Sequence, residues 1–137
     1  MGGEIELDRL LSTLTATLDE ELYVFATLAD GVVPSGLSPR MIFQEAEGTT
    51  LILTKSQASQ AGVDHEFPCR MITLNVHSSL EAVGFIARIS KELTHHGMGV
   101  NPVAGFYHDH LFVPDGREQE ALQVLREIAR PGSPKPE

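Results

Sequence analysis

The sequence predicts an α+β sandwich in which an antiparallel sheet carries helices on one face, the ferredoxin-like plan. Each half of the chain reads as a degenerate β-α-β-β-α repeat, and in the first half the crossing helix is reduced to a loop. Crossover connections are right-handed, and a strand containing Pro102 belongs at a sheet edge because proline donates no ladder hydrogen bond. We therefore expect an N-terminal half over residues 1–66, a C-terminal half over residues 67–130 and a disordered tail over residues 131–137.

The first half opens with a predicted helix over residues 6–18, followed by a strand over residues 21–28. The segment 29–39 contains two glycines and two prolines, so we expect it to be a loop. The helix prediction rests on leucines at helical spacing, which are Leu7, Leu10, Leu11, Leu14 and Leu18.

Two short β-prone runs, residues 41–46 and 49–54, are expected to form a hairpin. The dipeptide Glu47-Gly48 separates them, and its glycine can adopt the positive φ that a two-residue turn requires. A brief polar helix over residues 55–61 is expected to end at Gly62.

The second half begins with a strand over residues 70–77, whose alternating apolar residues indicate one buried face. Ser78 and Glu81 have the spacing of a capping box, which predicts a helix that begins at Ser79. Gly84 is expected to permit close approach of this helix to the sheet. The apolar stripe of the helix comprises Ala82, Phe85, Ile86, Ile89 and Leu93.

An edge strand over residues 98–104 and a return strand over residues 107–113 follow, joined by a turn at Gly105 and Phe106. The last helix is expected over residues 118–129. Its core-facing residues are Ala121, Leu122, Leu125 and Ile128.

Composition narrows the classes of function. The chain has 137 residues, a formal net charge of −9 and a single cysteine. Binding to nucleic acid needs clustered Lys and Arg, so nucleic acid is not an expected partner. No secretory signal and no apolar run long enough to cross a bilayer occur, so we expect a cytoplasmic protein without membrane contact.

Three separate runs carry a recognisable pattern: FQEAEGTTLIL (residues 43–53), ITLNVHSSLEAVGFIA (72–87) and GVNPVAGFYHDHLFVP (99–114). Together they closely resemble a family of small bacterial proteins made of tandem ACT-like domains. The resemblance spans roughly residues 10–128 and implies the ACT form of the ferredoxin-like sandwich. ACT domains are generally regulatory modules that bind amino acids or related ligands between paired domains. The resemblance thus implies a small-molecule ligand and a homo-oligomer, with no cofactor.

In ACT domains the ligand commonly sits at the turn after the first strand and at the start of the next helix, where backbone amides receive a carboxylate. Asn101 is suited to an amino-acid head group, or else holds a turn, and Glu47 either contacts a ligand cation or is an ordinary exposed carboxylate. His108 is expected to line the groove between the halves. The positions that match the turn are His77, Ser78, Ser79, Leu80 and Glu81, of which Ser78 and Glu81 alternatively only cap the helix.

An alternative chemistry rests on the triplet His108-Asp109-His110. On a strand, His108 and His110 project from the same face, so two imidazoles could ligate a metal such as zinc, with His77 or a histidine from the helix end as a third ligand. Two ligands make a weak site, and no residue set here indicates catalysis. We therefore expect a non-catalytic module that senses a small molecule, most simply an amino acid; the alternative is a metal-binding protein or metal-dependent enzyme centred on His108 and His110.

Overall fold

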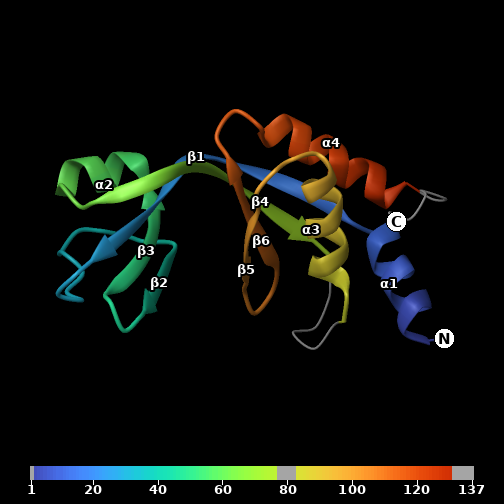
Figure 1. The fold of residues 1–137 in the computed structure, drawn as a ribbon, viewed down its shortest axis with the longest axis horizontal. Coiled ribbons are helices and arrows are strands. Elements are labelled where there is room, and N and C mark those ends of the chain that lie inside the picture. The colour runs from blue at the N-terminus through green and yellow to red at the C-terminus, as the bar shows by residue number, and fades with distance from the viewer. Residues whose placement is uncertain (1, 77–82, 131–137) are drawn as a thin grey trace. The chain divides into compact units, whose positions relative to one another are not determined.

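The computed structural model describes residues 2–76 and 83–130, with side chains from Leu7 onward (Figure 1). The described strands form one sheet in the order β2-β3-β1-β4-β6-β5, and the register of the β1–β3, β2–β3 and β5–β6 pairs is antiparallel. The elements in chain order are α1 (Gly2–Ser12), β1 (Thr15–Leu28), β2 (Met41–Gln44), β3 (Thr49–Thr54), α2 (Lys55–Ala61), β4 (His65–Asn75), α3 (Phe85–His95), β5 (Asn101–Ala104), β6 (Asp109–Pro114) and α4 (Glu118–Ala129).

The chain divides into two compact units. Unit 1 comprises residues 1–19 and 71–137, and unit 2 comprises residues 20–70. β1 and β4 each run through both units. The first 19 residues therefore cluster with the second half of the chain, while the predicted halves 1–66 and 67–130 stay a prediction.

Unit 1 buries its core between its part of the sheet and three helices. Leu11 and Leu14 from the N-terminal segment join this core, which explains why the start of the chain belongs to unit 1. Apolar residues of α3 and α4 complete it because both helices are amphipathic. The core contains Leu11, Leu14, Ile72, Leu74, Val76, Phe85, Ile89, Leu93, Met98, Leu111, Val113, Ala121, Val124, Leu125 and Ile128.

Unit 2 has a smaller core and a loop in place of its first helix. Val33 and Leu37 of that loop pack against the core, as the expected loop over residues 29–39 allows. The loop is tied down where the Ser38 amide donates to Gln57 Oε1 over 2.9 Å. The core residues are Val24, Ala26, Leu28, Leu51, Leu53 and Ala58.

The first predicted helix, residues 6–18, is wrong at both ends. α1 spans Gly2–Ser12, and Leu14 and Leu18 lie beyond it. β1 begins at Thr15 and not at residue 21, and its first half alternates so that Ala16 and Leu18 pack against the core. Leucines spaced by three and four residues continued the helical pattern into a segment whose threonines favour a strand.

The helix predicted to begin at Ser79 starts instead at Phe85. The structure leaves Val83 and Gly84 outside the helix, and Ser78 and Glu81 lie outside the described residues. The expected stripe is otherwise confirmed, since Phe85, Ile89 and Leu93 are buried and Ile86 packs against the core; Ala82 is not among the described residues.

Both predicted hairpins form, each with its tightest turn one residue away from the expected place. In the first, the amides and carbonyls of Glu45 and Gly48 bond to each other, so Ala46 and Glu47 are the central residues. In the second, the Gly105 amide donates to the His108 carbonyl, which leaves Phe106 and Tyr107 at the tip.

Several predictions are confirmed closely. α2 and α4 have the predicted bounds, and α2 ends at Gly62. β5, which contains Pro102, ends the strand order and so lies at a sheet edge. The fold is the expected α+β arrangement of a sheet with helices packed against it. Among the described helices, none is long and apolar enough to span a bilayer.

Candidate functional site

α3 of unit 1 begins directly after a glycine in a left-handed conformation. Gly84 precedes the helix with φ 88°, in the left-handed region that glycine adopts most easily. A Cβ there would approach Leu7 Cδ2 of α1 to 3.3 Å, so Gly84 meets α1 and not the sheet. No side chain of residues 7–76 or 83–130 caps this end, and the Gly84 carbonyl accepts the first helical bond, from the Arg88 amide over 2.9 Å. Among the described residues, the amides of the first turn thus have no side-chain cap.

Arg88 lies one turn into α3, with its side chain only 12% exposed. Its Nε atom is buried and has no hydrogen-bond partner among the described residues. It stands 3.6 Å from Glu92 Oε1, an ion pair longer than a hydrogen bond. Helical side chains lean toward the N-terminus, so Arg88 leans toward the first turn of α3. Its positive charge and that of the helix dipole thus favour an anion at the same helix end.

Asp109 is the first residue of β6 and is half-buried. It alternates with Leu111 and Val113, which belong to the core beneath the helices, so it faces the helix layer. Burial raises the pKa of the Asp109 carboxyl, and the nearby His110 and His108 partly counteract this. β4 and β6 are neighbours in the antiparallel sheet, so Asp109 lies at the sheet end where β4 stops before α3.

The opposite face of the sheet in unit 1 carries a row of paired polar groups. Asn75 Nδ2 donates to Thr17 Oγ1 over 2.7 Å, and Thr73 Oγ1 and His110 Nδ1 are 3.0 Å apart. These bonds tie β4 to β1 and to β6. The polar side chains of this face are thus engaged in holding strands together.

The structure brings few of the predicted ligand residues together. Asn101 is exposed and pairs with Phe112, so it sits three residues along β6 from Asp109, about 10 Å away at strand spacing. His108 is exposed in the β5–β6 hairpin, and Glu47 is exposed at the hairpin tip of unit 2. The turn positions His77, Ser78, Ser79, Leu80 and Glu81 lie outside the described residues.

The alternative metal site gains no third ligand from the described residues. In residues 2–76 and 83–130, no group of three or more His, Cys, Asp or Glu side chains is placed to hold a metal ion. His110 engages Thr73 through Nδ1, and His108 is in the hairpin that precedes β6. Metal binding by His108 and His110 stays a prediction.

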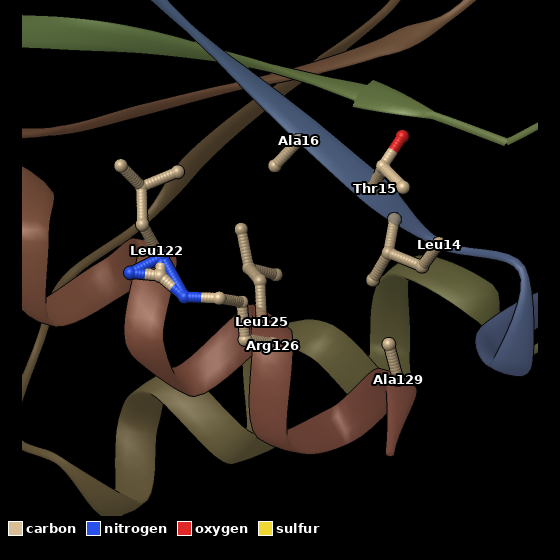
Figure 2. A pocket seen from close by; sticks show the side chains of 7 residues that line it. All are labelled: Leu14, Thr15, Ala16, Leu122, Leu125, Arg126 and Ala129. Carbon is tan, nitrogen blue, oxygen red and sulfur yellow. The ribbon is translucent and has the colours of Figure 1, made fainter. Parts of the chain in front are cut away.

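Two hollows lie away from the start of α3. One, in unit 2, has a volume of about 370 Å³ and is bordered by β1 and by residues 64–66. The other, of about 300 Å³, lies in unit 1 between the start of β1 and α4 (Figure 2). We call it the β1–α4 hollow. Its lining residues are Leu14, Thr15, Ala16, Leu122, Leu125, Arg126 and Ala129.

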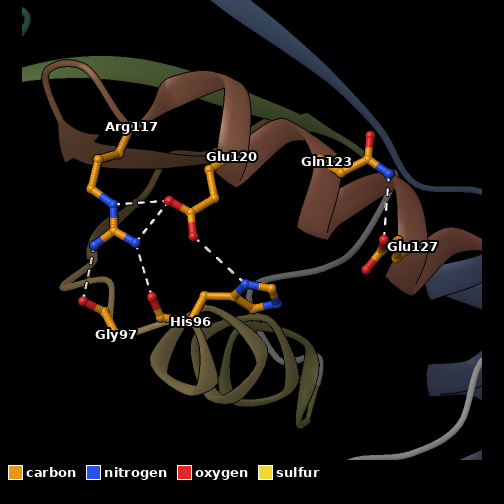
Figure 3. Close-up of polar contacts among 6 residues, drawn as sticks. All are labelled: His96, Gly97, Arg117, Glu120, Gln123 and Glu127. Carbon is orange, nitrogen blue, oxygen red and sulfur yellow. Dashed lines mark hydrogen bonds and ion pairs between the residues drawn. The ribbon is translucent and has the colours of Figure 1, made fainter.

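An arginine that the sequence analysis did not single out holds the other end of α3. Arg117 donates to the carbonyls of Gly97 and His96 over 3.0 and 2.9 Å, and it pairs with Glu120 Oε1 over 2.8 Å (Figure 3). His96 Nδ1 stands 3.6 Å from the other oxygen of Glu120. The cluster joins the end of α3 to the start of α4, and so fixes the helix that carries Arg88.

Sequence reasoning missed Arg88, Asp109 as a half-buried acid, and Arg117. For Arg88 a weak signal existed, because Arg88 and Glu92 have the i, i+4 spacing of a helical ion pair. For Arg117 the i, i+3 spacing to Glu120 indicates the ion pair, but no local signal indicates its carbonyl partners, which lie 20 and 21 residues away.

Comparison with known proteins now identifies the family. Models of the ACT domain match residues 2–70 and residues 66–127. This chain belongs to the ACT domain family. A Vibrio cholerae protein of unknown function, described as a possible transport protein, is 40% identical with a TM-score of 0.84; the match covers 93% of this chain and 99% of that one. No protein with a curated description matches this ACT protein.

More distant structures share the fold. The regulatory subunit of aspartate kinase from Thermus flavus is 11% identical with a TM-score of 0.66, and 85% of this chain matches 97% of it. Aspartokinase III of E. coli, solved in complex with aspartate and ADP, is 12% identical with a TM-score of 0.60, and 84% of this chain matches 32% of it. At these identities the likeness extends to the ACT fold.

Proposed function

We propose that this ACT protein is a non-catalytic sensing module that binds a free amino acid at the start of α3 in unit 1. The observation that carries the proposal is the uncapped start of α3 beside the nearly buried Arg88. An amino acid presents a carboxylate and an ammonium a few bonds apart. A site for it therefore needs one anion-binding group and one acid at the same place.

The start of α3 supplies the anion-binding group. Backbone amides at a helix start, together with the helix dipole, favour a carboxylate. Arg88 adds a fixed positive charge, and its buried Nε finds no hydrogen-bond partner within the part of the chain that the structure describes. A carboxylate accepting from Arg88 would satisfy that atom, and charge-assisted bonds of this kind are the strong ones.

Asp109 is the candidate partner for the ammonium group. It faces the helix layer at the sheet end where β4 stops, and its half-buried position makes an opposite charge favourable. The turn residues 77–81 connect β4 to α3 and remain proposed contributors, as do Asn101, His108 and Glu47. Binding between paired ACT units would also fit a homodimer, which we propose as the working form in the cytoplasm.

Family membership supports a regulatory use. The Thermus flavus relative is the regulatory subunit of an enzyme, and the E. coli relative was solved with aspartate bound. Regulation requires the ligand to bind two states of the protein with different affinities. We propose that the amino acid shifts the association of this module with a partner protein.

A thermal-shift screen of the free amino acids, followed by calorimetry on any that stabilise the full chain, tests the proposal. At a hundredfold excess over Kd, the bound amino acid should stabilise the fold by about 2.7 kcal/mol. Arg88→Gln and Asp109→Asn should each weaken binding at least tenfold. Arg9→Gln removes a positive charge from α1 of the same unit and is the matched control.

Two results would contradict the proposal. One is a flat response to all the amino acids. The other is an amino acid that stabilises the wild-type chain and binds Arg88→Gln with unchanged affinity, because the ligand would then occupy a different site.

A further inference from the structure

The β1–α4 hollow combines apolar surface with one positive charge. Leu14 and Leu125 form its buried part, with exposed fractions of 5% and 2%. Leu122, Ala16 and Ala129 are half-buried and pack against the core of unit 1. The hollow thus lies at the edge of the hydrophobic core of unit 1 and exposes part of it.

Two alanines create the space. Protein interiors are normally close-packed, and facing positions carry side chains large enough to fill the gap between elements. Here Ala16 on β1 and Ala129 at the end of α4 border the hollow with single methyl groups (Figure 2). A volume of about 300 Å³ is at the lower limit of the range that small-molecule sites occupy.

Among the described residues that line the hollow, Arg126 is the only charged one. It follows Leu122 by one helical turn, and its guanidinium lies beside Leu122 in Figure 2. Within residues 2–76 and 83–130 it makes no hydrogen bond or ion pair, although the chain has a net charge of −9. A guanidinium at an apolar rim is suited to a carboxylate, while its aliphatic stem covers apolar surface.

We infer that the β1–α4 hollow binds an unbranched aliphatic monocarboxylate, with the hydrocarbon chain in the hollow and the carboxylate on Arg126. An organic cation would meet the wrong charge. A metal ion would find no ligand set among the described lining residues, which include no acid, histidine or cysteine. The hollow lies on elements other than the start of α3, so this inference does not rest on the proposed amino-acid site.

Titration calorimetry of the full chain with octanoate, octanol and octylammonium tests the charge requirement. Octanoate should bind more tightly than octanol by about tenfold, and octylammonium should bind more weakly than octanol. From butanoate to octanoate, each further buried methylene should tighten binding about fourfold until the hollow is filled. Equal binding of octanoate and octylammonium would overturn the inference.

Variants locate the site. Ala129→Leu fills the hollow with a residue that favours helix, and it should abolish octanoate binding while leaving an amino-acid response intact. Arg126→Gln should lower octanoate affinity about tenfold to the level of octanol and leave octanol binding unchanged. Arg9→Gln, which removes a charge elsewhere in unit 1, should bind octanoate as the wild type does.

Methyl resonances provide a readout that needs no variant to fold. In a chain labelled at alanine methyl carbons, octanoate should shift the signals of Ala16 and Ala129 and leave Ala46, in the hairpin of unit 2, unmoved. Octanoate binding that leaves Ala16 and Ala129 unshifted would overturn the inference, as would full binding by Ala129→Leu.

Discussion

In unit 1 the side chain of Arg117 connects two helices. Arg117 satisfies two carbonyls at the end of α3 and pairs with Glu120 at the start of α4. Its side chain is 34% exposed, so solvent screens the ion pair, and the two carbonyl bonds matter more. Arg117→Gln should lower the free energy of unfolding by about 1–2 kcal/mol.

Urea denaturation measures this change. Arg9→Gln loses the same charge in the same unit and should shift stability by less than about 0.5 kcal/mol. Arg117→Lys keeps the charge but loses the planar guanidinium that reaches two carbonyls. Its free energy of unfolding should therefore lie between those of Arg117→Gln and Arg9→Gln. An Arg117→Gln chain as stable as the wild type would show that water hydrogen-bonds the Gly97 and His96 carbonyls as favourably as Arg117 does.

The pH dependence of stability should reveal the burial of Asp109. Because its pKa is raised in the fold, the folded state favours the protonated acid. The associated stability is fully present below the ordinary aspartate pKa of 3.8 and is lost as the pH rises through the raised value. Asp109→Asn should therefore raise Tm at neutral pH and have no such advantage at low pH.

Melting curves recorded between about pH 3 and about pH 7 test this. Asp115 is exposed, so Asp115→Asn is the control and should change Tm little. A Tm for Asp109→Asn below that of the wild type at neutral pH would mean that attraction to His110 and His108 outweighs burial.

These residues also show where sequence reasoning stops. Ser78 and Glu81 matched a local capping pattern, yet α3 begins at Phe85 after the left-handed Gly84. The burial of Asp109 depends on the packing of β6 into a core whose other members are distant in the chain, so no local pattern encodes it. The predicted site was thus centred on turn residues, whereas the described candidate groups lie on a helix and a strand.

Among the helices and strands, the sequence predicted the bounds correctly where residues within or next to the element determine them. α2 and α4 have the predicted bounds because a glycine after α2 and an amphipathic stripe in α4 are sufficient signals. The boundary between α1 and β1 failed because the leucines at positions 10, 11, 14 and 18 fit a helix, while those at positions 14 and 18 also fit a strand. Tertiary packing of Leu14 and Leu18 decided between them.

The β5–β6 hairpin depends on Gly105. A Cβ at that position would lie 2.9 Å from the His108 carbonyl oxygen, a backbone atom that cannot move without breaking the turn. Gly105→Ala should therefore destabilise the fold by about 1–3 kcal/mol. Gly99→Ala is the matched control, because no heavy atom of the described residues other than its chain neighbours lies within 4 Å of its Cβ position.

Chemical denaturation of Gly105→Ala and Gly99→Ala separates the effect of the close contact with the His108 carbonyl from the general effect of replacing glycine by alanine. Gly99→Ala should change stability by less than about 1 kcal/mol, in either direction. Equal stability of the two variants would show that the hairpin accommodates the methyl group by a backbone shift.

For the molecule as a whole, the N-terminal segment packs with the second half of the chain in unit 1. Residues 1–19 cluster with residues 71–137, and β1 enters unit 1 before it continues into unit 2. The sequence predicted two repeats in succession because each half carries its own strand and helix signals. It did not predict that the first segment packs with the second repeat, since that choice is made by long-range burial of Leu11 and Leu14.

Removal of residues 1–19 should consequently destabilise unit 1 more than unit 2. Leu11 and Leu14 are 3% and 5% exposed, and burial of each contributes about 1.5–3 kcal/mol, a large share of a typical stability of about 5–15 kcal/mol. Hydrogen exchange on a chain beginning at Glu20 should show lost protection in α3, β6 and α4, with protection in β3 and α2 largely retained. If the loss were instead confined to unit 2, the N-terminal segment would belong energetically to the repeat that follows it in the sequence, and the ACT units would be contiguous after all.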